Sequence, residues 1–206
     1  MARAAGSFSF SYLCSVFHAK IALLLIHSHQ ITIRKVSSAD LDWLHPFARR
    51  IFCEAYERYY TPEQFWGYTD WAFSQEQWQQ ELTDERNAFH VAWVEGQPAG
   101  YIKLSHGQEP ASLSDQSLLE VGRLYVDAPF HGRGIAQQLM DLAHEVGKDQ
   151  GFDGLWLVVW QQEGRALSFY RKNGFEPVGT YFFEMGDGLI EEDFLMRKLW
   201  KGTKGV

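Results

Sequence analysis

Residues 131–136, His-Gly-Arg-Gly-Ile-Ala, have the types and spacing that could hold an anionic ligand. Branched and aromatic residues at 118–126 predict a strand before them, and apolar residues at spacings of three and four predict a helix over about 134–149. A helix start presents unpaired N–H groups and a partial positive charge, which together favour a phosphate. Gly132 and Gly134 allow the backbone to approach such a ligand closely, and Arg133 adds positive charge.

This glycine turn by itself also fits a plain connection between strand and helix. It lacks the third glycine of a dinucleotide fingerprint, and no Gly-Lys-Ser/Thr follows as in a nucleotide-triphosphate loop. Downstream, residues 155–160 predict a buried strand and residues 165–172 a short helix that ends at Gly174. Both segments therefore place a loop after a strand, where α/β sheets bind ligands.

Together the two segments resemble the Gcn5-related N-acetyltransferase (GNAT) superfamily. In that pattern a Gln/Arg-x-x-Gly-x-Gly/Ala loop takes the pyrophosphate of acetyl-coenzyme A, and a later Ala-x-x-Phe-Tyr-x-x-x-Gly-Phe segment supplies a tyrosine beside the thioester sulfur. Residues 131–136 match the loop with His at its first position, and residues 166–175 match the second segment. The stretches 55–63, 99–104 and 180–199 are similar to PaiA-type polyamine acetyltransferases, so the resemblance covers about 31–199.

The resemblance implies acetyl-CoA as the co-substrate and assigns its contacts. The backbone N–H of Val126 would polarise the thioester carbonyl, and its two preceding residues would share main-chain bonds with pantetheine. Glu163 replaces an Asn of many relatives, and a carboxylate cannot donate the hydrogen bonds of an amide, although Gln161 or Gln162 could compensate. The expected coenzyme contacts are Leu124, Tyr125, Val126, His131, Gly132, Arg133, Gly134, Ile135, Ala136, Gln137, Glu163, Ala166, Tyr170 and Lys172.

A general base is needed because an alkylamine, with a pKa near about 10.4, is mostly charged at neutral pH and cannot attack. The resemblance puts a carboxylate at Glu120, which would act through a water chain. Strand alternation places Glu120 on one face with Leu124 and Val126, opposite Arg123. The alternative is a structural carboxylate paired with a cation, Arg123 or Lys103.

Tyr170 is the candidate general acid, because a phenol can hydrogen-bond a leaving sulfur and return a proton to it. The alternative is an aromatic residue on the core side of a helix. We weigh the functional role more heavily because the resemblance at residues 169–170 places a tyrosine beside the sulfur.

Two groups of residues are candidates for binding the acceptor. Carboxylates together with aromatic faces can hold a polycation, although for any single residue a solvated turn or a ring packed on the sheet is the favoured explanation. The acids are Glu184, Asp187, Glu191, Glu192 and Asp193, and the aromatic residues are Tyr56, Tyr59, Tyr60, Phe65, Trp66, Tyr68 and Trp71. We predict acetyl transfer to a primary amine, a polyamine or other small amine, by direct attack in a ternary complex. The alternatives are acetylation of a protein N-terminus or lysine, and a CoA-binding regulator without turnover.

Composition limits the partners and the compartment. The 206 residues, 46% of them hydrophobic, fit one domain at 31–200, with an N-terminal extension at 1–30 and a tail at 201–206. A net charge of -7 argues against nucleic acid, and the apolar run 21–26 is too short to span a membrane. Two cysteines, without metal-ligand spacing, favour a reducing cytoplasm and no metal site. The expected partner is a small-molecule amine, and a homodimer is left open.

The elements alternate in a way that predicts an α/β fold. Residues 31–35 indicate a strand, and Ser38 is expected to cap a helix that begins near Ala39. Thr61 and Ser74 cap further helices, and strands at 89–94 and 99–104 enclose a hairpin turn. The resemblance implies the GNAT fold: a mixed, mostly antiparallel sheet of about seven strands flanked by helices and splayed between its fourth and fifth strands.

Overall fold

The computed structural model describes residues 30–186 and 188–200. Most of the expected N-terminal extension, residue 187 and the tail at 201–206 lie outside this part of the chain. The strands are β1 (Ile31–Val36), β2 (Asn87–Val94), β3 (Gln97–Ser105), β4 (Leu118–Val126), β5 (Gly154–Trp160), β6 (Glu176–Gly186) and β7 (Leu189–Leu199). The helices are α2 (Leu41–Tyr56), α3 (Pro62–Ala72), α4 (Gln75–Thr83), α5 (Ile135–Asp149) and α6 (Gly164–Lys172).

The helix starts follow the capping chemistry of the sequence, with one correction. Thr61 and Gln64 form the expected capping box at α3, and the Ser74 side chain caps α4. At the first helical segment the cap is Ser37 instead of Ser38, because Asp40 stands three residues after Ser37 and completes a capping box with it. A 3-10 turn follows this cap, so α2 begins only at Leu41.

The seven strands form one mixed sheet in the order β1-β2-β3-β4-β5-β7-β6. Only β4 and β5 run parallel, and all other neighbours are antiparallel. The β2–β3 hairpin turns at Glu95 and Gly96, which both have positive φ. This is the two-residue turn that matches the right-handed twist of the flanking strands. This is the mixed sheet that the family resemblance implied.

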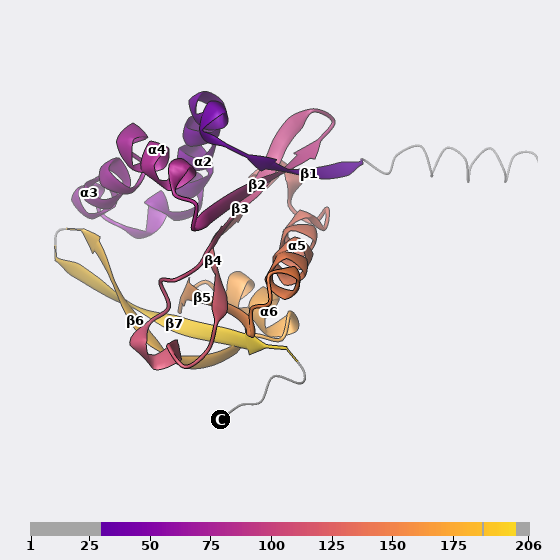
Figure 1. Ribbon diagram of the computed structural model, residues 1–206. Coiled ribbons are helices and arrows are strands. Elements are labelled where there is room, and N and C mark those ends of the chain that lie inside the picture. Colours follow the sequence, from indigo (N-terminus) through magenta and orange to yellow (C-terminus); the bar gives the residue numbers. More distant parts are fainter. Residues whose placement is uncertain (1–29, 187, 201–206) are drawn as a thin grey trace, which may run out of the picture.

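Helices cover both faces of the sheet (Figure 1). On one face α5 and α6 bury residues such as Leu139 and Leu167 against the strands. On the other face α2, α3 and α4 bury Leu44, Phe65 and Trp78, which are fully excluded from solvent. No helix in the described residues is long and apolar enough to cross a membrane.

The parallel β4–β5 pair is short, and its end opens a gap in the sheet. The pair is joined at Leu118–Gly154, Leu119–Leu155 and Glu120–Trp156. Beyond these residues no pairing between β4 and β5 occurs in the described part of the chain, although both strands continue. The sheet is therefore splayed between its fourth and fifth strands, as expected.

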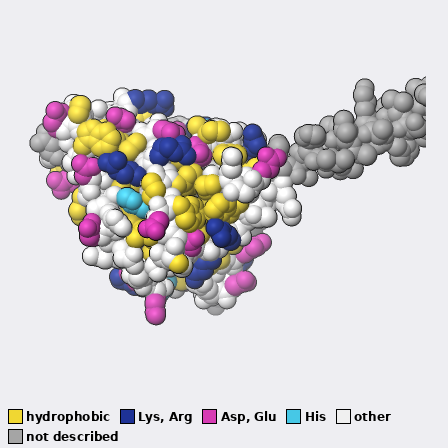
Figure 2. Space-filling model, turned by 90° about the horizontal axis from the view of Figure 1, so that it is seen from above, with side chains coloured by type: hydrophobic (Ala, Val, Ile, Leu, Met, Phe, Trp, Pro, Cys, Tyr) yellow, Lys and Arg dark blue, Asp and Glu magenta, His cyan; other side chains and the backbone are white. Residues whose placement is uncertain are grey.

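The molecular surface carries charges of both signs. Seen from above the view of Figure 1, basic and acidic side chains are interspersed among hydrophobic ones (Figure 2). The sequence carries a net charge of -7 at neutral pH, and the basic side chains on this face form no continuous stripe. This face offers no stripe of the kind that follows a nucleic-acid backbone.

Candidate active site

The glycine loop before α5 presents a row of unpaired backbone amides. Gly132 and Gly134 have φ angles of 78° and 80°, a conformation that favours glycine, and Gly134 is the N-cap of α5. The first helical bond runs from the N–H of Gln138 to the carbonyl of Gly134. Within the described residues, no N–H of residues 132–137 donates to a backbone carbonyl. These amides, at the positive end of the helix dipole, can bind a diphosphate.

The His131 side chain is turned away from this row and onto the protein. Its Nε2 lies 2.8 Å from the carbonyl oxygen of Val126, and its Nδ1 lies 3.2 Å from the guanidinium of Arg165. Nε2 therefore carries the hydrogen that Val126 accepts, and Nδ1 accepts from Arg165. Arg133 stands over the Phe130 ring at 5.2 Å. The sequence did not single out Arg165, which places a second guanidinium beside the loop.

The backbone of β4 turns free amides into the gap beside β5. Asp127 donates its N–H to Ala99 of β3 at 2.9 Å. Because successive backbone amides of a strand point to opposite sides, the N–H groups of Val126 and Leu124 point toward β5, which has already separated. Tyr125 lies between them and packs its ring against Tyr101. An extended chain rich in amides could hydrogen-bond along this edge.

The remaining predicted coenzyme contacts lie around the same opening. Gln137 binds Asn173 through both ends of its amide and so joins α5 to α6, while Ile135 is buried beneath the loop. Glu163 is the N-cap of α6 but makes no capping hydrogen bond with its side chain. On α6, Ala166 is half-buried against the core, Tyr170 is buried and Lys172 is exposed in the last turn. The amides of the loop and of β4 fit the diphosphate and amide groups of acetyl-CoA.

A bulge in β4 changes the predicted distribution of side chains. The β3–β4 register shifts after Lys103–Arg123, so that Leu104 pairs with Val121 and Gly122 is the extra residue. Val121 consequently packs in the same core as Leu124, on the α5 side. The sequence alternation, which placed Glu120 with Leu124, is wrong across this bulge because one unpaired residue inverts the faces beyond it.

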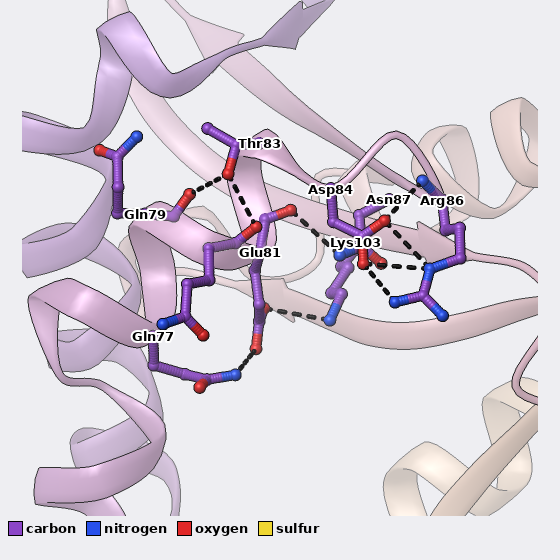
Figure 3. A network of polar contacts seen from close by, with 9 residues as sticks. Gln77, Gln79, Glu81, Thr83, Asp84, Arg86, Asn87 and Lys103 are labelled. Carbon is purple, nitrogen blue, oxygen red and sulfur yellow. Dashed lines mark hydrogen bonds and ion pairs between the residues drawn. The ribbon is translucent and has the colours of Figure 1, made fainter.

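Glu81 of α4 holds the two cations that lie nearest to Glu120. Its carboxylate lies 3.0 Å from Nζ of Lys103 and 2.7 and 3.0 Å from the two terminal nitrogens of Arg123. Gln77, one turn earlier on α4, also donates to Glu81, as Figure 3 shows together with the Lys103 contact. The side chains of Glu81, Lys103 and Arg123 are only 10%, 15% and 16% exposed. No pattern in the sequence points to Glu81, because its partners come from β3 and β4.

Glu120 is consequently left without an ion pair among the described residues. It faces Lys103 and Arg123, which favour its ionised form, as well as Glu81 and Glu109, which oppose it. Burial is the largest influence, and it raises the pKa of Glu120 above its usual range. The alternative that Lys103 or Arg123 pairs with Glu120 is wrong, since Glu81 takes both cations.

Tyr170 lies on the buried face of α6, with 9% of its surface exposed. Its ring contacts Phe169 and Phe175 at 5.5 and 5.8 Å. Burial raises the pKa of Tyr170, and the nearby Tyr56 raises it further. Tyr170 therefore stays protonated at neutral pH and can donate a hydrogen bond; it is also part of the core, as its alternative interpretation held.

Tyr56 at the end of α2 stands next to both strands that border the gap. Its ring lies 6.3 Å from those of Tyr125 on β4 and Trp160 on β5. Burial raises the pKa of Tyr56 to about 12, and Tyr125 opposes this rise through a hydrogen bond. The charges of Glu163 and Asp193 raise the pKa of Tyr56 further, and Asp193 of β7 pairs with Trp160, whose ring Tyr56 contacts. Tyr56 thus connects the Tyr170 side of the gap with the acidic residues of β7.

The other predicted aromatic residues separate into two groups. Phe65 is fully buried, and Trp66 and Tyr68 pack against the same core, whereas Trp71 is 64% exposed. Tyr59 and Tyr60 instead lie beside Trp160, at 5.0 and 6.1 Å between ring centroids. The aromatic residues predicted to contact the acceptor are therefore partly core and partly a rim beside the gap, and the exposed Trp71 belongs to neither group.

Comparison with known proteins agrees with this geometry. The model of the acetyltransferase (GNAT) family matches residues 47–175. An uncharacterised N-acetyltransferase of Lactobacillus delbrueckii is 28% identical over 168 residues, which cover 82% of this chain and 96% of the relative. A protein of Thermoplasma acidophilum named spermidine N(1)-acetyltransferase is 27% identical over 175 residues, which cover 83% of this chain and 98% of that protein.

The solved structure of a PaiA N-acetyltransferase from Thermoplasma acidophilum, in complex with coenzyme A, is similar over the whole domain. Its TM-score is 0.66 at 27% identity, covering 83% of this chain and 99% of the other. The family match runs from within α2 to just beyond α6, which includes the gap between β4 and β5 and the glycine loop. The chain belongs to the acetyltransferase (GNAT) family and is an acetyl-CoA dependent N-acetyltransferase.

Proposed function

We propose that this enzyme acetylates a small primary amine, a polyamine in particular, by direct attack of the amine on the thioester in a ternary complex. The observation that carries the proposal is the pair of carboxylates, Glu191 and Asp193, which stand beside the β4–β5 gap without a cation partner among the described residues. The similarity to a protein named spermidine N(1)-acetyltransferase supports the same acceptor class. An acidic site of this kind attracts a cationic acceptor.

Coenzyme binding is assigned to backbone groups. Bound acetyl-CoA supplies the acetyl group as a thioester. The free amides of residues 132–137 hold the diphosphate, helped by the Arg133 charge, and the exposed edge of β4 at Leu124 and Val126 holds the pantetheine chain. The Val126 N–H stabilises negative charge on the carbonyl oxygen as the amine attacks. His131 fixes the end of β4 by binding the Val126 carbonyl.

Glu120 and Tyr170 divide the proton transfers between them. Glu120, half-buried and without an ion pair in the described part of the chain, accepts a proton from the ammonium through water, which gives a neutral nitrogen that can attack. Tyr170, protonated at neutral pH, donates a hydrogen bond and then a proton to the departing sulfur. Its proton is replaced from solvent or from the neighbouring Tyr56 hydroxyl. The nitrogen loses one proton before it attacks and a second as the amide forms. One of these is balanced by the proton that sulfur gains, and the other passes through Glu120 to solvent, so atoms and charge balance.

The test is coenzyme A release by the purified protein with acetyl-CoA and a panel of spermidine, 1,4-diaminobutane, butylamine and a peptide with a free N-terminus. The proposal expects release with the small amines, and most strongly with the polyamine. Release with the peptide alone would assign the enzyme to protein acetylation and overturn the small-amine proposal.

A further inference from the structure

Asp193 is a buried carboxyl group with an unused oxygen. It lies on β7 between Trp160 of β5 and Tyr181 of β6, and only 8% of its surface is exposed. Its Oδ1 is buried and has no hydrogen-bond partner in the described part of the chain. Leaving such an atom unpaired is costly, so a cationic hydrogen-bond donor that reaches it is bound favourably.

The surroundings of Asp193 are acidic and aromatic. Glu191 lies two residues earlier on the same face of β7, and its Oε2 accepts from the indole N–H of Trp160 at 3.2 Å. Burial raises the pKa of the Tyr60 hydroxyl, and both carboxylates, together with a hydrogen bond to Glu191, raise it further. Burial raises the pKa of Asp193, and the neighbouring Glu191 raises it further, to about 6. Neither acid has an ion pair among the residues that the structure describes.

Aromatic rings border these two acids. Trp160 is bordered by Tyr59 and Tyr60, with ring centroids at 5.0 and 6.1 Å. Tyr59 is 45% exposed, so the group reaches solvent at this side. Arg58 stands over the ring of Tyr59 at 4.8 Å and donates to its hydroxyl. Rings beside carboxylates suit an alkylammonium, since they contact both its methylenes and its charge.

We propose that Asp193 and Glu191, bordered by Trp160, Tyr59 and Tyr60, bind a second ammonium group of the acceptor. This second ammonium site lies beside the β4–β5 gap. Trp160, which pairs with Asp193 between β5 and β7, has its ring 6.3 Å from that of Tyr56, and Tyr56 lies at the same distance from the Tyr125 ring on β4. A diamine therefore binds with one nitrogen at this second ammonium site and the other at the thioester. This inference rests on the proposed function and deepens it: two cationic nitrogens, not one, define the preferred substrate.

The test compares kcat/KM for 1,4-diaminobutane and butylamine, which have the same chain length but differ in the second nitrogen. The wild-type enzyme should prefer the diamine, and Asp193→Asn should reduce the diamine-to-monoamine ratio by about 10- to 100-fold, as expected for loss of a charge-assisted hydrogen bond. Glu191→Gln, which changes a half-buried position, should reduce the same ratio and serves as a second variant if Asp193→Asn folds poorly.

Glu192→Gln is the matched control, because this acid lies between the other two, points to the opposite face of β7 and is exposed. Its ratio should stay at the wild-type value. A wild-type diamine-to-monoamine ratio near one, or equal effects of Glu192→Gln and Asp193→Asn on this ratio, would refute the second ammonium site. Acetylation of small amines would still stand. Absence of turnover with every small amine would instead refute the proposed function itself.

Discussion

Replacing Glu81 with Gln should destabilise the protein severely, because two cations would lose their shared partner. The Glu81 carboxylate contacts Lys103 at 3.0 Å and Arg123 at 2.7 and 3.0 Å, and all three side chains are at most 16% exposed. Removing one partner from a buried ion pair costs about 3 to 5 kcal/mol. For a domain of this size that loss lowers Tm by about 6 to 20 °C.

The assay is urea unfolding followed by tryptophan fluorescence at pH 8 and pH 6. Burial alone would raise the pKa of Glu81, but Arg123 and Lys103 outweigh it and hold this pKa below 4.5. The carboxylate therefore stabilises the fold fully above pH 4.5, and this contribution is lost only as the pH falls through the lowered pKa of the folded state. The difference between wild type and Glu81→Gln should therefore be equal at both pH values. Asp84→Asn removes the half-buried partner of the exposed Arg86 in the same network of polar contacts (Figure 3) and should have a much smaller effect.

Glu81→Gln should also change the pH profile of the reaction. With Glu81 neutral, Lys103 and Arg123 are free to favour the ionised form of Glu120 and lower its raised pKa. The acidic limb of kcat/KM should then move to lower pH, measured under conditions where the variant is folded. A loss of stability below about 1 kcal/mol would refute the energetic reasoning, which rests on the buried ion pairs. An unmoved acidic limb would refute the link between Glu81 and Glu120.

Three further changes test the assigned roles. Tyr170→Phe should lower kcat by about 100-fold, as loss of a general acid does, with little change in the Kd of coenzyme A by calorimetry; equal activity would return Tyr170 to a purely structural role. Glu120→Gln should abolish the acidic limb of the pH–rate profile, which in the wild type lies above pH 4.5 because burial raises the pKa of this group, and an identical profile would exclude it as the base. Gly134→Ala should weaken coenzyme A binding about tenfold or more, since a side chain at φ 80° strains the loop; unchanged affinity would argue against the loop as the diphosphate site.

The elements of this fold could be predicted from local patterns. Apolar periodicity located the helix after Gly134 and the strand before it, and capping residues such as Thr61 marked helix starts within a residue. Ser37 was missed because two adjacent serines both fit the cap and only the position of Asp40 chooses between them. Local signals suffice where hydrogen bonds close within one turn.

Long-range contacts could not be predicted in the same way. The bulge at Gly122 depends on the register with β3, so strand alternation alone misplaced Leu124 relative to Glu120. Glu81 lies 42 residues from Arg123, and nothing in the sequence near either residue indicates that they pair. Sequence patterns identified Asp193 as one of several acids, but only the structure distinguishes its buried, unpartnered oxygen from the exposed Glu192.

The most direct test of the central claim is mass spectrometry of the products formed from acetyl-CoA and spermidine by the purified enzyme. Transfer at the β4–β5 gap predicts one acetyl group on the amine for each coenzyme A released, with no acetyl group left on the protein. Coenzyme A release without an acetylated amine, or an acetylated protein that forms before the amine is added, would contradict direct transfer in a ternary complex.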